Sequence, residues 1–311
     1  GYTYAFDVAN REWQDHFIEV LRYYVRELGA DGFRIDAPMW NHFPNWDPDI
    51  AYKSGTSTVG ALGLFKRARE ALGELGKDVI FFTEPGGPML HTVFDITYSY
   101  DEMWLLGSLV EPIADPYSSW YTPFDHSITA REMRDWLRYK RLVHPGDSFR
   151  RVVRQIDSHD SFEWIGAGQF KHEAFGPEAA RALFACKALL EGGIMNFVGG
   201  EEGSEDFYRR VLQLRDRPEF ALGRADFDAS SSDDDMVYHL AYRHGDRSML
   251  VVINFGTAET TCRLDLMGLR DPCVPEVLLG IPESFAHRFE KDGTGIVGCR
   301  LAPFEVLVLS F

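Results

Sequence analysis

Three acidic residues follow apolar stretches at points where β-strands are expected to end. Asp36 closes the run 32–37, Glu84 follows the apolar residues 79–82, and Asp160 comes shortly after the run 151–157. The carboxyl ends of parallel strands share one face, and in barrel enzymes that face carries the chemistry. Carboxyl groups in one cleft drive their pKa values apart, so one stays protonated while another is ionised. Glycoside hydrolysis needs such a set: one carboxylate at the anomeric carbon and one acid at the leaving oxygen.

Taken singly, each of these acids also fits a structural role. Asp36 and Asp160 could cap the segments that follow them, and Glu84 precedes Pro85, where a turn is expected. It is their shared position at strand ends that favours catalysis.

The elements that would position these acids alternate along the first two-thirds of the chain. Apolar residues recur at helical spacing from Asn10 to Leu28, where Asn10 can cap the helix and Gly29 can end it. The sequence predicts strands at 32–37, 79–82, 94–98, 151–157 and 194–198, and further helices at 62–75, 129–139, 177–192 and 207–214. Alternating strands and helices indicate βα units with a parallel sheet of five strands.

After about Leu222 the pattern changes to short strands joined by polar turns. We expect strands at 236–242, 249–254, 260–266, 295–301 and 305–309, which indicates an all-β module, an antiparallel sandwich. The polar segment 226–235 is predicted to be an exposed link. The predicted domains are therefore 1–222 and 223–311.

Composition excludes several classes of partner. The formal net charge of −16 disfavours nucleic acid and anionic membranes, and no stretch approaches the roughly 18 apolar residues of a membrane span. Aromatic residues make up 14% of the chain and would also suit a sugar-binding cleft. The four cysteines, Cys186, Cys262, Cys273 and Cys299, lack metal-site spacing. We expect buried thiols, with one disulfide among the last three as the alternative.

The local sequences resemble those of a known enzyme family. Gly32-Phe33-Arg34-Ile35-Asp36-Ala37 is similar to the nucleophile motif of the α-amylase family, glycoside hydrolase family 13. Phe82-Thr83-Glu84 resembles the family's acid motif, and Ile156-Asp157-Ser158-His159-Asp160 resembles its last acidic motif, with Ser158 in place of the usual Asn. Residues 192–203 resemble the eighth strand with its loop, and 207–215 the helix before the C-terminal sandwich. The resemblance covers nearly the whole chain.

This resemblance implies a fold and a set of roles. The fold would be a partial (β/α)8 TIM barrel, about strands 4 to 8, followed by the antiparallel β-sandwich. Asp36 would be the nucleophile of a retaining α-glycosidase acting on α-glucans or related oligosaccharides through a glycosyl-enzyme, and Glu84 its general acid and then base. Asp160 would stabilise the transition state. Arg34 would hold Asp36 ionised, and His159 would hydrogen-bond the sugar. The simpler readings are a plain ion pair for Arg34 and a core histidine for His159.

Two departures from the family pattern limit these implications. Met39-Trp40 stands where many α-amylases carry Lys-His, which argues against an endo-acting starch amylase; Trp40 would be a sugar platform or a packing residue. The first three barrel strands have no counterpart, so we expect a second polypeptide or a missing segment to complete the barrel, because open strand edges are unstable. The chemistry needs no cofactor or metal, and structural calcium cannot be argued from this half.

Two other functions are compatible with the same residues. A transglycosylase or isomerase would pass the glycosyl-enzyme to a sugar hydroxyl instead of water. A catalytically silent member would bind sugar or act as a scaffold; the intact acidic set argues against it, and the absent strands argue for it. A metal-dependent hydrolase would need a His-x-His pair at a strand end, and the sequence has none.

Overall fold

The computed structural model describes residues 8, 10–38, 42–43, 55–56, 61–84, 87–99, 101–102, 109–110, 127–144, 146–162, 168–268, 274–289 and 294–311. Its contacts divide the chain into two compact units, Gly1–Tyr100 with His144–Val153 and Asp101–Val143 with Arg154–Phe311. No helix in these described ranges is long and apolar enough to cross a membrane.

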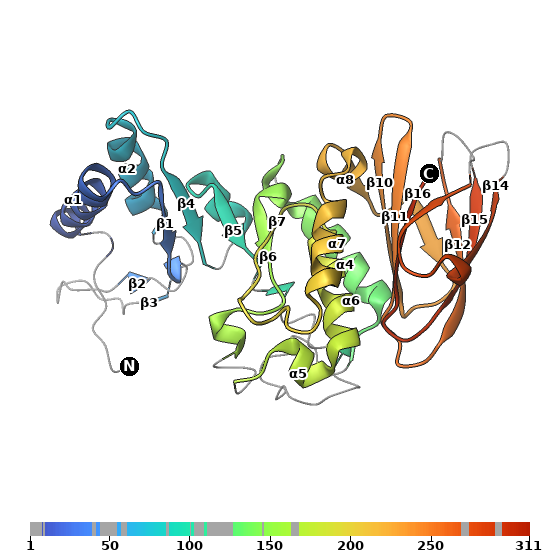
Figure 1. Cartoon of the computed structure of the whole chain (residues 1–311). Helices are drawn as coiled ribbons and strands as arrows, with labels where there is room; N and C mark the ends of the chain where they lie inside the picture. The colour runs from blue at the N-terminus through green and yellow to red at the C-terminus, as the bar shows by residue number, and fades with distance from the viewer. Residues whose placement is uncertain are drawn as a thin grey trace. The chain divides into compact units, whose positions relative to one another are not determined.

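The first unit is built from strand and helix in alternation (Figure 1). Its elements are α1 (Arg11–Leu28), β1 (Gly32–Ile35), the short pair β2 (His42–Phe43) and β3 (Gly55–Thr56), α2 (Leu62–Gly73), β4 (Ile80–Thr83), the 3-10 turn η2 (Pro88–Thr92), β5 (Ile96–Tyr98) and the 3-10 turn η3 (Ser148–Arg151). Helix α1 begins and ends as predicted: Asn10 Oδ1 accepts from Trp13 N at 2.9 Å, and Gly29 ends the helix with a φ of 70°.

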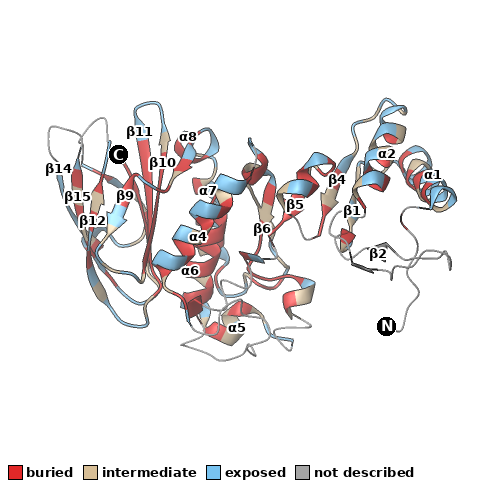
Figure 2. Cartoon of the chain, turned by 180° about the vertical axis from the view of Figure 1, so that it is seen from behind, coloured by how far each residue is buried: buried red, intermediate tan, exposed pale blue. Residues whose placement is uncertain are grey.

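A buried apolar cluster holds the two helices against the strands of this unit. Ile18, Leu21 and Val25 of α1 pack with Leu64 and Phe65 of α2, and the cluster extends to strand residues, including Phe81 of β4. Figure 2 shows the buried stripes of α1 and α2 in red, with their exposed faces in pale blue. The helices therefore cover the strands as βα units do.

Close parallel pairing fixes the first two strands of the sheet. Gly32 to Ile35 of β1 pair with Ile80 to Thr83 of β4 in register. A Cβ atom at Gly32 would lie 2.5 Å from the carbonyl oxygen of Ile80, so only glycine permits this approach at the start of the strand. The parallel sheet has the order β1-β4-β5-β6-β7, where β6 is Val152–Arg154 and β7 is Gly193–Ile194. This confirms the predicted five-stranded parallel sheet.

The second unit contains the remaining helices and two antiparallel sheets. Its helices are α4 (Ala130–Val143), α5 (Lys171–Phe175), α6 (Pro177–Ala188), α7 (Glu205–Leu214) and α8 (Pro218–Ala221). Its other strands are β8 (Arg224–Asp226), β9 (Ser230–Ser232), β10 (Val237–His244), β11 (Arg247–Asn254), β12 (Thr260–Leu266), β13 (Glu276–Leu279), β14 (Phe285–Phe289), β15 (Gly295–Leu301) and β16 (Val306–Ser310), with the 3-10 turn η5 (Pro282–Ser284) before β14.

These strands form two sheets, ordered β13-β16-β11-β10-β8 and β14-β15-β12-β9, which both contribute side chains to one buried apolar cluster. The prediction of an all-β region with antiparallel strands is confirmed. The predicted domain boundary at 222–223 lies just before β8 and stays a prediction.

The prediction of an exposed link over residues 226–235 is wrong. Ser230 to Ser232 form strand β9, which pairs with Leu264 to Leu266 of β12. Ser230 is buried, and its Oγ lies 2.7 Å from His239 Nδ1. Residues 230–232 form a strand because their backbone pairs with a neighbouring strand, and not because their side chains are hydrophobic. The strand predicted at 194–198 is likewise shorter than expected: it ends at Ile194, and residues 198–203 form turns.

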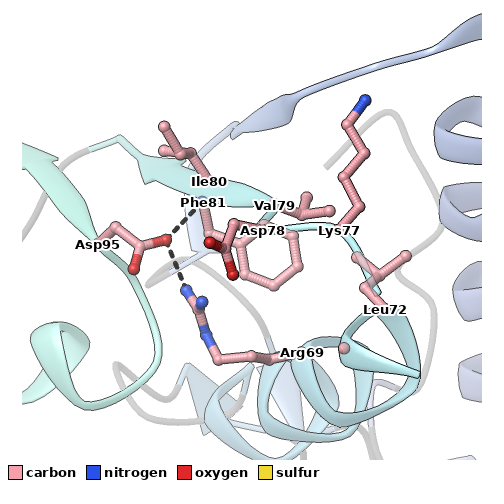
Figure 3. Close-up of a pocket in the computed structure, with 9 residues that line it drawn as sticks. Arg69, Leu72, Lys77, Asp78, Val79, Ile80, Phe81 and Asp95 are labelled. Carbon is pink, nitrogen blue, oxygen red and sulfur yellow. Dashed lines mark hydrogen bonds and ion pairs between the residues drawn. The ribbon is translucent and has the colours of Figure 1, made fainter. Parts of the chain in front are cut away.

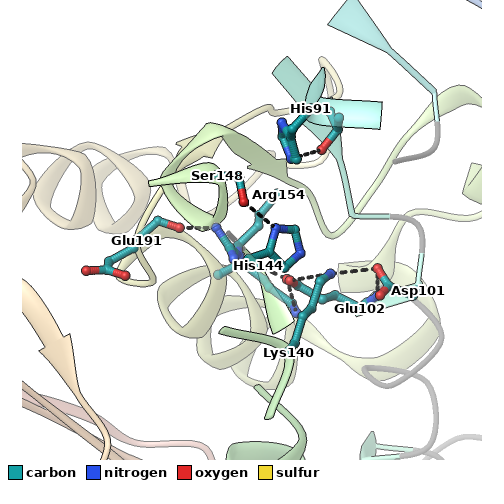
Figure 4. Close-up of polar contacts among 10 residues, drawn as sticks. His91, Asp101, Glu102, Lys140, His144, Ser148, Arg154 and Glu191 are labelled. Atoms are coloured by element: carbon teal, nitrogen blue, oxygen red, sulfur yellow. Dashed lines mark hydrogen bonds and ion pairs between the residues drawn. The ribbon is translucent and has the colours of Figure 1, made fainter. Parts of the chain in front are cut away.

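A buried charge network joins four side chains of the second unit (Figure 4). The Glu102 carboxylate accepts from Lys140 Nζ at 2.9 Å, from Arg154 Nε at 3.0 Å and from Lys187 Nζ at 3.1 Å. The side chains of Glu102, Arg154 and Lys187 are fully buried. Burial alone would raise the pKa of Glu102, but the charges of Arg154, Lys140 and Lys187 hold it well below its ordinary value. One carboxylate thus neutralises cations from α4, β6 and α6.

We predict that Glu102→Gln lowers the free energy of unfolding by about 3–5 kcal/mol, because it leaves three cations buried around a neutral group. Since the folded pKa of Glu102 is lowered, its contribution is fully present above its unfolded pKa of about 4.3 and is lost as the pH falls through the folded value. Urea unfolding at several pH values measures both effects. The matched control is Glu178→Gln, an exposed partner of Arg181, which should cost less than about 1 kcal/mol. Equal losses in the two variants would contradict the prediction.

Candidate active site

Asp36 and Glu84 lie at the same edge of the parallel sheet because their strands pair in register. Ile35 is paired with Thr83, and each acid is the next residue along its strand. The ladder extends one step further, since Glu84 N donates to Ile35 O at 3.0 Å. The sequence prediction that these two carboxylates share one strand edge is therefore met by the geometry of the first unit.

A single guanidinium bridges the two carboxylates. Arg34 donates through Nη1 to Asp36 Oδ1 and through Nη2 to Glu84 Oε2. The Asp36 side chain is 75% exposed and that of Glu84 is 9% exposed, so the two acids stand in different surroundings. Burial alone would lower the pKa of Arg34, but its bond to Tyr98 and the nearby acids raise it overall. Arg34 therefore stays charged, and its guanidinium holds the Asp36 and Glu84 carboxylates near each other.

Tyr98 completes this arrangement, although the sequence prediction did not include it. Arg34 Nη2 donates to Tyr98 Oη at 2.8 Å, and the Tyr98 side chain is buried at the end of β5. Burial raises the pKa of Tyr98, the hydrogen bond from Arg34 opposes that rise, and the nearby Glu84 carboxylate adds to it, so the pKa is raised overall. The hydroxyl therefore stays protonated. The signal in the sequence was the position of Tyr98 at the end of a predicted strand, the place that also marked the acids.

The backbone is strained immediately after Asp36. Ala37 has a φ of 40°, a conformation that residues with a Cβ rarely adopt. Such strain costs on the order of 1–3 kcal/mol and concentrates at functional sites. Here it turns the chain directly after the exposed carboxylate.

The last acidic motif, in the second unit, is anchored by a buried ion pair that sequence reasoning also missed. Lys171 Nζ lies 3.2 Å from Asp157 Oδ1, and both side chains are almost fully buried. Burial raises the pKa of Asp157, while the charge of Lys171 opposes that rise. Ser158 and Ser161 then close a turn reciprocally: Ser158 N donates to Ser161 Oγ at 2.7 Å, and Ser161 N donates to Ser158 Oγ at 3.2 Å. The turn that carries His159 and Asp160 is fixed at both ends.

His159 and Asp160 lie on this turn with different exposure. The His159 side chain is 55% exposed, so the simpler reading of a core histidine is wrong, and Asp160 is 19% exposed. His159 Nε2 lies 3.5 Å from Asp160 Oδ1. Asp160 Oδ2 is buried and accepts no hydrogen bond within the part of the chain that the structure describes. A buried acceptor of this kind can receive a ligand hydroxyl.

The loop after β7 packs beside the base of this turn. Glu201 Oε2 accepts from Asn196 Nδ2 at 2.6 Å and from Gly199 N at 3.1 Å. A Cβ atom at Gly200 would lie 3.2 Å from Asp157 Oδ2, so the loop backbone runs close to the buried ion pair. These contacts explain why the strand ends early and how the loop keeps its shape.

Trp40, the predicted sugar platform, lies outside the described residues. In the described ranges, no group of three or more His, Cys, Asp or Glu residues is arranged to hold a metal ion.

A hollow of about 260 Å³ in the first unit lies at the other end of β4 from Glu84 (Figure 3). Arg69 and Asp95 line it, and they satisfy each other: Arg69 Nη2 donates to Asp95 Oδ2 at 2.7 Å. The same Asp95 oxygen accepts from Phe81 N at 2.8 Å. This hollow brings together none of the predicted site residues, and its polar groups act as structural contacts.

Comparison with solved structures identifies the fold. The chain is similar to a maltogenic alpha-amylase, AmyB, of Thermotoga neapolitana, with 20% sequence identity and a TM-score of 0.67 over 98% of this chain and 67% of that one. It is similar to a debranching enzyme of Nostoc punctiforme, with 16% identity and a TM-score of 0.71 over 98% and 63%.

A third similar structure is a cyclic alpha-maltosyl-(1-->6)-maltose hydrolase of Arthrobacter globiformis, with 18% identity and a TM-score of 0.61 over 97% and 60%. This chain thus spans about 60 to 67% of the length of these enzymes. No protein-family profile and no curated protein matches the sequence.

We predict that Tyr98→Phe lowers the free energy of unfolding by about 1–3 kcal/mol, because Arg34 loses a buried acceptor and Glu84 a donor. Thermal or urea unfolding measures the loss. Tyr23→Phe is the matched control: it removes a hydroxyl from a side chain of the same unit that is 52% exposed, and should change stability by less than about 0.5 kcal/mol. A Tyr98→Phe variant as stable as this control would show that the hydroxyl is not a structural member of the site.

Proposed function

Because the chain has the fold of the α-amylase family, glycoside hydrolase family 13, we propose that it carries the catalytic centre of a retaining α-glycosidase acting on α-glucans or related oligosaccharides. The observation that carries the proposal is the Arg34 bridge between Asp36 and Glu84 at paired strand ends. The fold by itself does not select a reaction, so these residues have to carry the argument.

The geometry favours a retaining mechanism. One guanidinium binds both carboxylates through its two terminal nitrogens, which brings the carboxyl groups close together. Retaining enzymes keep their two carboxyl groups about 5–5.5 Å apart, whereas inverting enzymes leave about 6.5–9.5 Å for a water molecule. Asp36, exposed and paired with Arg34, is the nucleophile that forms the glycosyl-enzyme. Glu84 gives its proton to the leaving oxygen and then takes one from water.

Within the second unit, Asp160 and His159 have the chemistry to bind sugar hydroxyls. Asp160 Oδ2, which accepts nothing among the described residues, receives a sugar hydroxyl. His159, half-exposed beside Asp160, donates to another hydroxyl. The names of similar structures include maltogenic, debranching and maltosyl-maltose-hydrolysing enzymes, which supports an oligosaccharide as the substrate class.

The proposal also includes a complete (β/α)8 barrel followed by a β-sandwich. Five parallel strands do not close a barrel of eight, so further βα units complete it, either from the same polypeptide or from a second one. The shared apolar cluster of the two antiparallel sheets supports the sandwich.

We expect Asp36→Asn in the active assembly to lower kcat by about 10⁴-fold or more while leaving the unfolding temperature unchanged, because it removes the nucleophile and keeps the volume. Rates on maltooligosaccharides measure this, and proton NMR of the wild-type product should show the α-anomer first. The matched control is Asp31→Asn, an exposed residue at the opposite end of β1 that pairs with Lys77. Normal rates in Asp36→Asn, or a β-anomer, would refute the retaining assignment. Transfer products without hydrolysis would instead identify a transglycosylase.

We further expect the 311-residue chain, purified alone, to be inactive and either to self-associate or to bind a polypeptide that supplies βα units. Apolar strand faces left open to water can gain roughly 25 cal/mol for each Å² that association buries, and this gain drives association. Light scattering combined with an activity assay tests this expectation. A monodisperse, active monomer of 35.5 kDa would contradict it and would require the site to be complete within this chain.

A further inference from the structure

Two cysteines face each other in the β-sheet of the second unit that contains β12 and β15. Cys262 of β12 and Cys299 of β15 are direct partners in the antiparallel register. They are 2% and 1% exposed, and both belong to the apolar cluster beneath the sheets. Their thiols hydrogen-bond to each other. The two side chains therefore lie side by side on one face of the sheet.

This placement is close to the geometry of a disulfide. Directly opposed residues of antiparallel strands have Cα atoms about 4.5–5.5 Å apart. Disulfides are found at Cα separations of about 4.4–6.8 Å with Cβ atoms about 3.5–4.5 Å apart. Bridging the pair thus needs a small approach of the side chains and no change of register. The product is small and apolar and suits the core in which the thiols lie.

We infer that Cys262 and Cys299 are a site of reversible oxidation, at which a small-molecule disulfide such as oxidised glutathione cross-links β12 to β15. The Cys262 sulfur, as thiolate, attacks one sulfur of glutathione disulfide and releases one glutathione thiolate. Cys299, losing its proton, then attacks the Cys262 sulfur of the mixed disulfide and releases the second. Both protons pass to the two released glutathione thiolates, and the two electrons that Cys262 and Cys299 lose in forming the protein disulfide reduce the sulfur–sulfur bond of glutathione disulfide.

Local electrostatics support the order of attack. The hydrogen bond from Cys299 lowers the pKa of Cys262, while the same bond raises the pKa of Cys299. The thiolate is the attacking species, so Cys262 reacts first. Cys186 provides a contrast within the same unit: it lies in α6, and burial raises its pKa to about 11. It has no cysteine opposite it in the described part of the chain.

Because both thiols are buried, oxidation requires a local opening of the sheet. The reaction is therefore slow in the native state and faster in mild denaturant. Once formed, the cross-link joins the two central strands of the four-stranded sheet and closes a loop that contains β13 and β14. Closing that loop restricts the unfolded chain, so the oxidised form resists unfolding more than the reduced form.

The test is to incubate the full chain with oxidised glutathione, with and without mild urea, until its mass stops changing. Remaining thiols are then alkylated and the peptides mapped by mass spectrometry. We expect one cross-linked peptide pair joining Cys262 to Cys299, formed faster in urea and reversed by dithiothreitol. Cys262→Ser should abolish the cross-link, and Cys186→Ser, the matched control, should leave it unchanged.

Hydrogen exchange on the same samples reports the effect on the fold. Amides of β12 and β15 should exchange more slowly after oxidation in the wild type and in Cys186→Ser, but not in Cys262→Ser or, if that variant is unstable, in Cys262→Val. Full alkylation of both cysteines after incubation would overturn the inference. So would a disulfide from either one to Cys186 or Cys273, or an oxidised pair that leaves exchange in β12 and β15 unchanged.

Discussion

Parallel pairing makes neighbouring strands end at the same edge, and the candidate chemistry of the first unit depends on this constraint. With Ile35 opposite Thr83, the next residue on each strand is an acid, and Arg34 reaches both from within β1. Gly32 permits the pairing because a side chain there would meet the Ile80 carbonyl. The apolar cluster beneath α1 and α2 packs the strands against their helices and so fixes the position of the strand ends that carry the two acids. Tyr98 extends the same edge by one more strand.

Charge is handled in opposite ways at the sheet edge and in the helical layer of the second unit. At the edge, one cation serves two carboxylates, and one of these, Asp36, remains exposed enough to meet a ligand. In the second unit one carboxylate, Glu102, serves three cations in full burial, where nothing can reach it. The first arrangement leaves the Asp36 carboxylate accessible, and the second fixes α4, β6 and α6 to one another. Asp157 and Lys171 form a second buried ion pair, next to the turn that carries the more exposed His159 and Asp160.

The sequence predicted most of the parallel sheet because the alternation of strand and helix patterns can be read from residues that are close together in the chain. Helix α1 was predicted with both caps, since Asn10 and Gly29 act on adjacent backbone groups. The antiparallel region was predicted less completely. The residues of β9 have the composition of a loop, but they form a strand because their backbone pairs with β12. The end of β7 was misplaced because Glu201, several residues onward, binds Asn196 and the Gly199 amide and turns the chain.

For the site, the sequence alone identified three acids from their positions and the motifs around them: Asp36 and Glu84 follow paired strands, whereas Asp160 lies on a turn several residues beyond the end of β6. Only the tertiary structure decided which side chains contact the residues of the site. Tyr98 and Lys171 come from other strands and helices, and no local pattern states which side chain a buried group will contact. The same holds for Cys262 and Cys299, whose types are visible in the sequence but whose facing positions follow from the register of β12 on β15. Local propensity is set by neighbours along the chain, whereas burial, pairing and charge compensation are set by neighbours in space.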